Sequence, residues 1–115
     1  MTTAAAKLYR AAVRLRDLHP DMTLSQIQLL AVVADNPGII QAEVFQRLGQ
    51  TDSAVSRNIA LLSDIGSRHR DGLELIDIRV NPQDRRERFL SLTRKGERLM
   101  VDLSMDLNSN RGASI

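Results

Sequence analysis

The chain has 115 residues, enough for one domain with a modest core. Its 43% apolar and 26% charged residues are ordinary for a soluble globular protein and argue against disorder, and the absence of cysteine excludes disulfides, thiolate zinc sites and a cysteine nucleophile. The formal net charge of +2 is too small to identify a partner by itself.

Neither membrane insertion nor secretion is expected. No apolar run approaches the roughly 18 residues that a membrane span needs. Lys7, Arg10, Arg14 and Arg16 interrupt the apolar N-terminal stretch, which therefore does not resemble a signal peptide. A reducing cytoplasm is the expected location.

Two helices are predicted in the first third of the chain. Residues 3–18 repeat apolar side chains at steps of three and four, the period of a helix with one apolar face. Thr23 and Gln26 have the spacing of a capping box, so a second helix should begin near Leu24. The Asn-Pro-Gly sequence at 36–38 should stop that helix.

A helix-turn-helix is predicted over residues 41–66. The segment 41–48 has helical apolar spacing, and Gly49 suits the left-handed position that follows a helix end. Thr51 is a good N-cap for the next helix, which should end at Gly66. A short helix, a turn with glycine and a longer helix are typical of this motif.

The first two turns of the second helix carry small or hydrogen-bonding side chains, and these allow two interpretations. Such residues let a helix enter the major groove of DNA closely, where they read base edges or hold phosphates. The same residue types are also common in any first helical turn because they cap it. From this segment alone the two interpretations are equal. The residues are Asp52, Ser53, Ala54, Ser56, Arg57 and Asn58.

Two strands are predicted after the helix-turn-helix. Residues 73–80 alternate and are rich in β-branched side chains, residues 81–84 read as a turn, and residues 89–92 resume as a strand. This order makes a winged helix, with the wing at residues 73–93. The three arginines close to Asp84 exceed what a solvated turn needs, so the backbone and narrow groove of DNA are the expected partner.

A last helix is predicted to begin at the Thr93 cap, and residues 109–115 are expected to fray. Its apolar stripe could complete the core of one chain. Two amphipathic ends, at 1–19 and 94–108, favour instead a homodimer that buries both. The positions predicted for this interface are Leu8, Ala12, Leu15, Leu99, Leu103 and Leu107.

At this point the chain resembles the MarR family of bacterial winged-helix transcriptional regulators. The resemblance covers roughly residues 20–100, and it implies a single winged-helix domain over 1–115, mainly α with a small antiparallel β wing (α+β), flanked by dimerisation helices. The matching pieces are Leu48-Gly49, Val55-Ser56-Arg57, Leu62, Gly66, Asp84-Arg85-Arg86 and Leu92-Thr93-Arg94-Lys95-Gly96.

Carried over residue by residue, the resemblance implies that Asp84 holds and aims Arg86 into the minor groove, with Arg85 near the backbone. A charge-assisted contact would preorganise the guanidinium. The alternative is an Asp-Arg pair that only stabilises the turn. The positions predicted to contact double-stranded DNA are Thr51, Ser53, Ala54, Ser56, Arg57, Asn58, Asp84, Arg85 and Arg86.

The chain departs from the family pattern at three places. Phe45 stands where a small residue is usual, and Gln50 replaces a commonly apolar turn position; both departures can alter the angle between the two helices and with it the contacts to individual bases. The segment 67–72, Ser-Arg-His-Arg-Asp-Gly, lengthens the connection to the wing. It either adds phosphate contacts or is a solvated loop, and the second view is slightly favoured.

Other functions have less support. His19 and His69 lack metal-ligand spacing, and no catalytic motif or cofactor site is found, so an enzyme is not expected. A winged helix that docks on proteins is one alternative, although its wing would more often expose apolar residues. A regulator that senses a small molecule is another, but no residue identifies an inducer.

Overall fold

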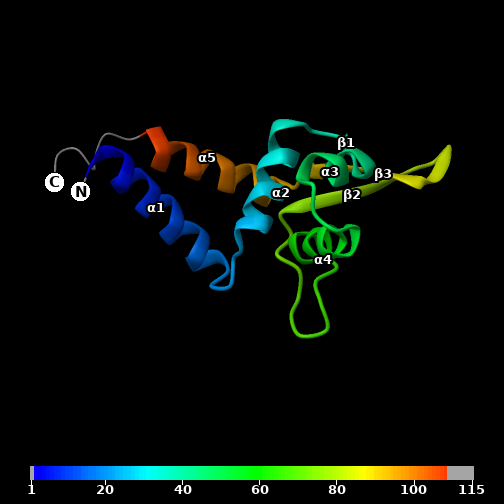
Figure 1. Cartoon of the computed structure of the whole chain (residues 1–115), viewed down its shortest axis with the longest axis horizontal. Helices are drawn as coiled ribbons and strands as arrows, with labels where there is room; N and C mark the ends of the chain where they lie inside the picture. Colours follow the sequence, from blue (N-terminus) through cyan, green and yellow to red (C-terminus); the bar gives the residue numbers. More distant parts are fainter. Residues whose placement is uncertain (1, 109–115) are drawn as a thin grey trace. The chain divides into compact units, whose positions relative to one another are not determined.

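The computed structural model describes residues 2–108, so the fraying expected for residues 109–115 lies outside the described residues. The predicted class, mainly α with a small antiparallel sheet, is confirmed (Figure 1). None of the helices in the described range is long and apolar enough to cross a membrane. The elements are α1 (Thr3–Leu18), α2 (Leu24–Asp35), β1 (Ile39–Ile40), α3 (Gln41–Leu48), α4 (Asp52–Leu62), β2 (Ile76–Asn81), β3 (Asp84–Leu92) and α5 (Arg94–Asn108).

The chain forms two compact units. The first contains the described parts of Met1–Met22 and Arg98–Ile115, that is, α1 and most of α5. The second, Thr23–Glu97, contains the three middle helices, the sheet and the first turn of α5. The candidate site residues of the helix-turn-helix and the wing all lie in the second unit.

The middle helices begin and end where their capping residues predict. The Thr23 hydroxyl accepts from the Gln26 N–H at 3.2 Å while the Gln26 side chain accepts from the Thr23 N–H at 2.9 Å, so the capping box is confirmed. Gly49 follows α3 with a φ of 61°, a left-handed conformation that glycine adopts without strain. These signals act through neighbouring backbone groups, which is why the sequence alone reveals them.

The sheet has the order β1-β3-β2, and its strands differ from the predicted ones. β1, which pairs Ile39 with Leu90, was not predicted, because two residues are too few to show an alternating pattern. β2 begins at Ile76 rather than at residue 73, and β3 begins at Asp84 rather than at residue 89. The first strand of the wing is therefore shorter than expected and the second is longer, with a tight turn between them.

The end of α4 explains the late start of β2. Here α4 ends at Leu62 and not at Gly66, because the Ser63 hydroxyl donates to the Ala60 carbonyl at 2.9 Å and replaces the next helical hydrogen bond. The returning chain then bonds to the same helix end. Its backbone N–H groups donate from Leu73 to Leu61 and from Leu75 to Leu62, at 2.8 and 2.7 Å, so neither is available to a strand.

The core of the second unit is aliphatic, as expected for a chain with only 3% aromatic residues. Helices α2, α3 and α4 and the sheet each contribute to it. Burial of each such side chain contributes about 1.5–3 kcal/mol before the entropy of ordering is subtracted. The fully buried members are Leu29, Leu30, Val33, Val44, Val55, Leu62, Leu75, Ile76 and Leu90.

In the first unit, an arginine of α1 joins a carboxylate of α5. Arg14 donates through Nε and Nη2 to the two carboxylate oxygens of Asp106 at 2.6 and 3.0 Å, and its Nη1 lies 3.7 Å from Asp102. The hydrogen bond to Asp106 raises the pKa of Arg14 above its usual value. Arg10 adds a bond of 3.1 Å to the Asp106 carbonyl. A bidentate pair of this kind fixes orientation as well as distance.

The first turn of α5 packs against the segment before β2. The Thr93 hydroxyl accepts from the Gly96 N–H at 3.0 Å, which confirms the predicted cap, and it donates to the Glu74 carbonyl at 2.6 Å. The Thr93 N–H donates to the Leu75 carbonyl at 3.0 Å. A Cβ atom at Gly96 would overlap that same carbonyl oxygen, so only glycine allows this approach.

We therefore expect Gly96→Ala to lower the free energy of unfolding by about 1–3 kcal/mol, the usual cost of forcing atoms into a packed site. Alanine otherwise favours helix, so a stabilisation would contradict the close contact. Urea unfolding followed by circular dichroism measures the change. Arg94→Ala, at an exposed position in the same turn, is the matched control and should change stability little.

Candidate nucleic-acid interface

Helix α4 presents a polar face outside the core. The Thr51 hydroxyl accepts from the Ala54 N–H at 3.2 Å and so fixes where the helix begins. Val55, Ile59 and Leu62 are buried beneath the helix. The predicted contact positions that stay exposed are Thr51, Ser53, Ser56 and Arg57, whereas Ala54 is half-buried. Short side chains around one long cation leave the helix surface accessible to a partner.

Asn58 lies differently from its predicted neighbours. It is half-buried, and its Oδ1 accepts from the Gln26 side chain of α2 at 3.4 Å. Gln26 is itself buried and belongs to the capping box. Asn58 thus holds α4 against α2, a pairing that sequence reasoning missed because the two residues are far apart in the chain.

The two unusual positions of the helix-turn-helix each have a structural role. The Gln50 side chain donates to Gln28 of α2 at 3.2 Å, so the turn is held by a polar contact instead of an apolar one. Phe45 is half-buried and lines an open groove of about 400 Å³ between α3 and the wing. The remaining lining residues are Ile40, Gln41, Ala42, Asp84, Arg86, Glu87 and Arg88.

The tip of the wing departs from regular pairing. Val80 pairs with Arg88, but the next residue, Asn81, pairs with Asp84. Arg85, Arg86 and Glu87 therefore have no paired residue on β2 and bulge from the ladder. Bulges re-aim side chains, and this one turns two consecutive arginines outward.

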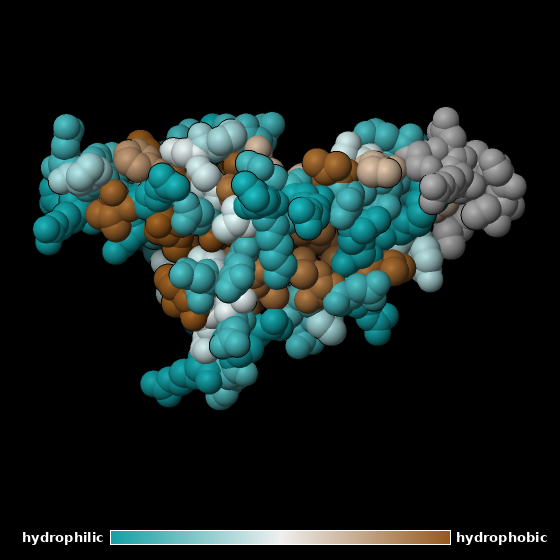
Figure 2. Space-filling view, turned by 180° about the vertical axis from the view of Figure 1, so that it is seen from behind, coloured by the Kyte–Doolittle hydropathy of each residue, from teal (hydrophilic) through white to brown (hydrophobic). Residues whose placement is uncertain are grey.

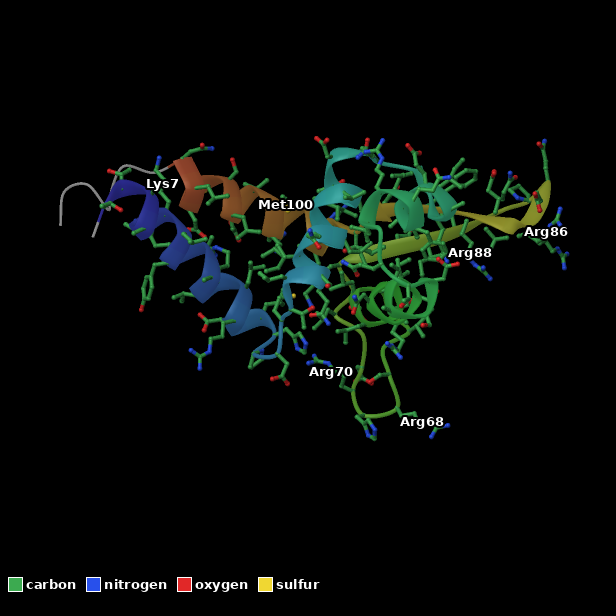
Figure 3. The ribbon with its side chains drawn as sticks, viewed as in Figure 1. Lys7, Arg68, Arg70, Arg86, Arg88 and Met100 are labelled. Atoms are coloured by element: carbon green, nitrogen blue, oxygen red, sulfur yellow. The ribbon has the colours of Figure 1, made fainter. Side chains whose placement is uncertain are left out.

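The Asp84 side chain pairs with a backbone N–H that has no partner on β2. Its Oδ1 accepts from the backbone N–H of Arg86 at 3.0 Å and lies 3.5 Å from the Arg86 Nε. The Arg86 side chain is 94% exposed and stands at the end of the wing (Figure 3). An ion pair this exposed adds little to stability, and the shorter of the two contacts is to the Arg86 backbone and not to its guanidinium.

Asn81 shapes the turn from the other strand. Its Oδ1 accepts from the Gln83 N–H at 2.9 Å, and its Nδ2 donates to Glu87 at 2.9 Å. Two further exposed arginines on the wing, Arg79 and Arg88, were not among the predicted positions. Arg79 pairs with Asp77 at 3.0 Å, whereas Arg88 has no ion pair within residues 2–108. Arg79 and Arg88 could have been found from the alternation of inward and outward side chains along the two strands.

Three of the six predicted interface positions are already covered in a single chain. Leu15, Leu99 and Leu103 are only 8%, 8% and 7% exposed. The expectation that they are uncovered in one chain is therefore wrong. An apolar stripe read from the sequence does not separate the face that packs inside the chain from the face that remains outside.

The other three positions, Leu8, Ala12 and Leu107, are exposed, and Leu8 is exposed by 68%. Further exposed apolar side chains lie on the same two helices. These are Tyr9 and Val13 on α1 and Val101 and Met105 on α5. The two residues of each pair are four positions apart and so lie on one face of their helix. This spacing is visible in the sequence, but these residues were not among the predicted interface positions. The first unit thus keeps an apolar surface in the isolated chain.

Residues 2–108 contain no group of three or more histidines or acidic residues that could hold a metal ion. The interface described so far has short polar groups on a helix and oriented arginines on a hairpin. Such groups hold phosphates and base edges by hydrogen bonds and charge.

Comparison with known proteins supports this description. Residues 21–66 match the model of the MarR family. Transcriptional regulator HosA of Escherichia coli O111:H- is 28% identical over 82 residues, which are 71% of this chain and 55% of that protein. The chain thus spans about half the length of this curated relative.

Two similar solved structures contain DNA. A mutant of MepR from S. aureus bound to an oligodeoxyribonucleotide is 25% identical, with a TM-score of 0.65 over 85% of this chain and 65% of that one. The transcriptional repressor CouR bound to a 23-mer DNA duplex is 21% identical, with a TM-score of 0.66 over 97% of this chain and 69% of that one.

A helix-turn-helix followed by an antiparallel wing makes the second unit a winged helix. Residues 21–66 therefore resemble the MarR family, and the fold resembles that of the MepR mutant and of CouR.

The geometry of the wing tip leads to a prediction that needs no DNA. Asp84→Ala should speed hydrogen exchange at the Arg86 backbone amide by about two- to tenfold, the range for loss of one ordinary hydrogen bond. Exchange followed by NMR measures it. Gln83→Ala, in the same turn, removes no such acceptor and serves as the control. Equal exchange in both variants would show that Asp84 does not hold this amide.

Proposed function

We propose that the chain is a transcriptional regulator that binds double-stranded DNA, with α4 in the major groove and Arg86 in the minor groove. The observation that carries the proposal is the wing tip, where the Arg86 side chain is 94% exposed and its Nε lies 3.5 Å from Asp84 Oδ1. An ion pair that served only to stabilise the turn would contribute little at this exposure. An exposed and oriented arginine is suited to an external anionic partner.

The chemistry of α4 supports the placement in the major groove. Ser53, Ser56 and Arg57 are exposed in its first two turns, and α4 bears no large exposed apolar residue. Serine hydroxyls both donate and accept, while arginine makes a bidentate contact with guanine or holds a phosphate. Asn58 is assigned a positioning role because its amide already contacts Gln26.

Charge on the wing favours DNA over a protein partner. Four exposed arginines, Arg79, Arg85, Arg86 and Arg88, accompany a single exposed large apolar residue, Val80. A narrow minor groove concentrates negative potential and attracts an inserted arginine. Two proteins of similar fold, the MepR mutant bound to an oligodeoxyribonucleotide and CouR bound to a 23-mer DNA duplex, support DNA as the partner.

We also propose that the active form is a homodimer joined through the exposed apolar side chains of α1 and α5. Leu8, Tyr9 and Val13 on α1 and Val101, Met105 and Leu107 on α5 are each at least 40% exposed. Burying each is worth up to about 1.5–3 kcal/mol, so several together offset the entropy of association. Two-fold symmetry would then require a DNA site with two matching halves.

The wing is tested by Arg86→Ala. We expect binding to all duplexes to weaken by about tenfold or more, as for loss of a hydrogen bond to a charged group. The loss should be larger when the flanks are rich in A·T, since their narrow minor groove favours arginine. Asp84→Ala should weaken binding less, because it removes orientation and not the cation. Titration of labelled duplexes at fixed salt provides the measurement.

Arg16→Ala is the matched control, since it removes one exposed arginine from the other unit and changes the net charge equally. Its affinity should stay close to that of the unmodified chain. If Arg86→Ala binds as tightly as this control, the wing has no part in DNA binding.

The dimer is tested by replacing Val101 and Met105 together with Asp. Both side chains are exposed, 60% and 64%, so the fold of one chain should tolerate the change. We expect monomers that bind a half-site weakly and gain no affinity from the full site, as seen by light scattering and duplex titration. Leu24→Asp, at an 80% exposed position on α2, should remain dimeric. An unmodified chain that is monomeric at micromolar concentration and binds DNA one-to-one would exclude the dimer.

A further inference from the structure

The connection between α4 and β2 contains a second, smaller hairpin. Ser67 and Arg70 form an antiparallel bridge in which the Ser67 N–H donates to the Arg70 carbonyl at 2.9 Å. The His69 N–H donates to the Ser67 hydroxyl at 3.3 Å and closes the turn. We call residues 67–70, Ser-Arg-His-Arg, the basic hairpin. It projects from the domain as a short hairpin, and the sequence leaves open whether it adds phosphate contacts or is a solvated loop, with the second view slightly favoured.

The base of the basic hairpin is held by the end of α4. On one side the Gly66 N–H donates to the Ala60 carbonyl at 2.8 Å, and on the other the Glu74 N–H donates to the Ser63 carbonyl at 3.0 Å. Gly72 lies so close to the Ser63 carbonyl that a Cβ atom would overlap it. The hairpin therefore has a defined position relative to α4, and a ligand bound by α4 would meet it at a fixed place.

The chemistry of the basic hairpin fits an anionic partner. Arg68, His69 and Arg70 are all exposed, and Arg68 extends from the tip (Figure 3). Seen from behind, the projection is hydrophilic (Figure 2). Asp64 and Asp71 are exposed at its base, and the Arg70 Nε donates to the Asp71 carbonyl at 3.1 Å. Arg70 is next to Asp71 in the chain, whereas Arg68 is separated from both aspartates by at least two residues. Residues 66–72 include no apolar side chain that could fill a protein groove.

The hairpin and the wing lie at different places around α4. The hairpin leaves the C-terminal end of α4, through bonds to residues 60–63, and the wing extends in another direction (Figure 1). The exposed residues assigned to base reading, Ser53, Ser56 and Arg57, occupy the first two turns instead. We propose that the basic hairpin is an additional DNA-binding arm, in which Arg68 contacts phosphates beyond the C-terminal end of α4 that the wing does not reach.

This inference rests on the proposed DNA binding, and it assigns a phosphate contact and no base reading. An arginine makes two parallel hydrogen bonds to a phosphate, and such contacts fix register without selecting sequence. The arm should therefore strengthen binding to every duplex alike. Its distinguishing property is its dependence on salt, because each phosphate neutralised by a cation releases counterions.

The test uses the full chain and a duplex selected by it from a random-sequence pool. Arg68→Ala should lower the slope of log affinity against log salt by about 0.9 per protomer, whereas Arg68→Lys should keep the slope because it keeps the charge. In Arg68→Ala, ethylation of certain phosphates should no longer interfere with binding, and these should differ from the phosphates at which Arg86→Ala loses interference. Arg16→Ala again controls for net charge and should keep both the slope and the interference pattern.

Two results would overturn the inference, and they are distinguishable. If Arg68→Ala keeps the slope and every interference site while Arg86→Ala loses its own, the hairpin is only a solvated loop and the proposed DNA binding remains. If the unmodified chain selects no duplex from the pool, the proposed function fails and the arm fails with it. Arg68 is exposed at the tip and has no ion pair within residues 2–108, so its removal should leave the thermal unfolding midpoint unchanged.

Discussion

In the second unit, the backbone N–H and carbonyl of Leu75 join three elements by hydrogen bonds. The Leu75 N–H donates to the last residue of α4, and its carbonyl accepts from the Thr93 N–H before α5, while its side chain is fully buried. The end of α4, the base of the wing and the start of α5 thus meet at one residue. Because buried backbone groups are costly to leave unpaired, none of these three elements can shift without breaking a hydrogen bond of another.

Residues near Leu75 differ in kind from residues far from it. Near it, the buried side chains are mostly aliphatic, and Gly96 lets the backbones approach each other. Away from it, at the start of α4 and the tip of the wing, side chains are polar and exposed. Arg86 illustrates the second kind, since its contact with Asp84 is exposed and adds little stability. Changes at the tip should therefore affect binding without affecting folding, and changes near Leu75 should do the reverse.

The sequence predicted those features that depend on neighbours in the chain. The capping box at Thr23, the turn at Gly49 and the cap at Thr51 are local, and all three are present. Features that depend on distant residues were missed. The Asn58 amide meets Gln26 across 32 positions, and β1 exists only through its pairing with β3. Periodicity located the apolar faces of α1 and α5 but could not say which side chains the same chain already covers.

The bulge in β3 also separates the length of the wing tip from the pairing of its strands. Between the pairs Ile76–Leu92 and Val80–Arg88 the register is continuous, and the irregularity falls entirely beyond them. Insertions, deletions or exchanges within residues 81–87 would then leave the hydrogen-bonded stem and the core beneath it unchanged. The tip can therefore be exchanged as a unit: segments of different length and charge could replace residues 81–87 while the Val80–Arg88 pair and the strands below it are kept.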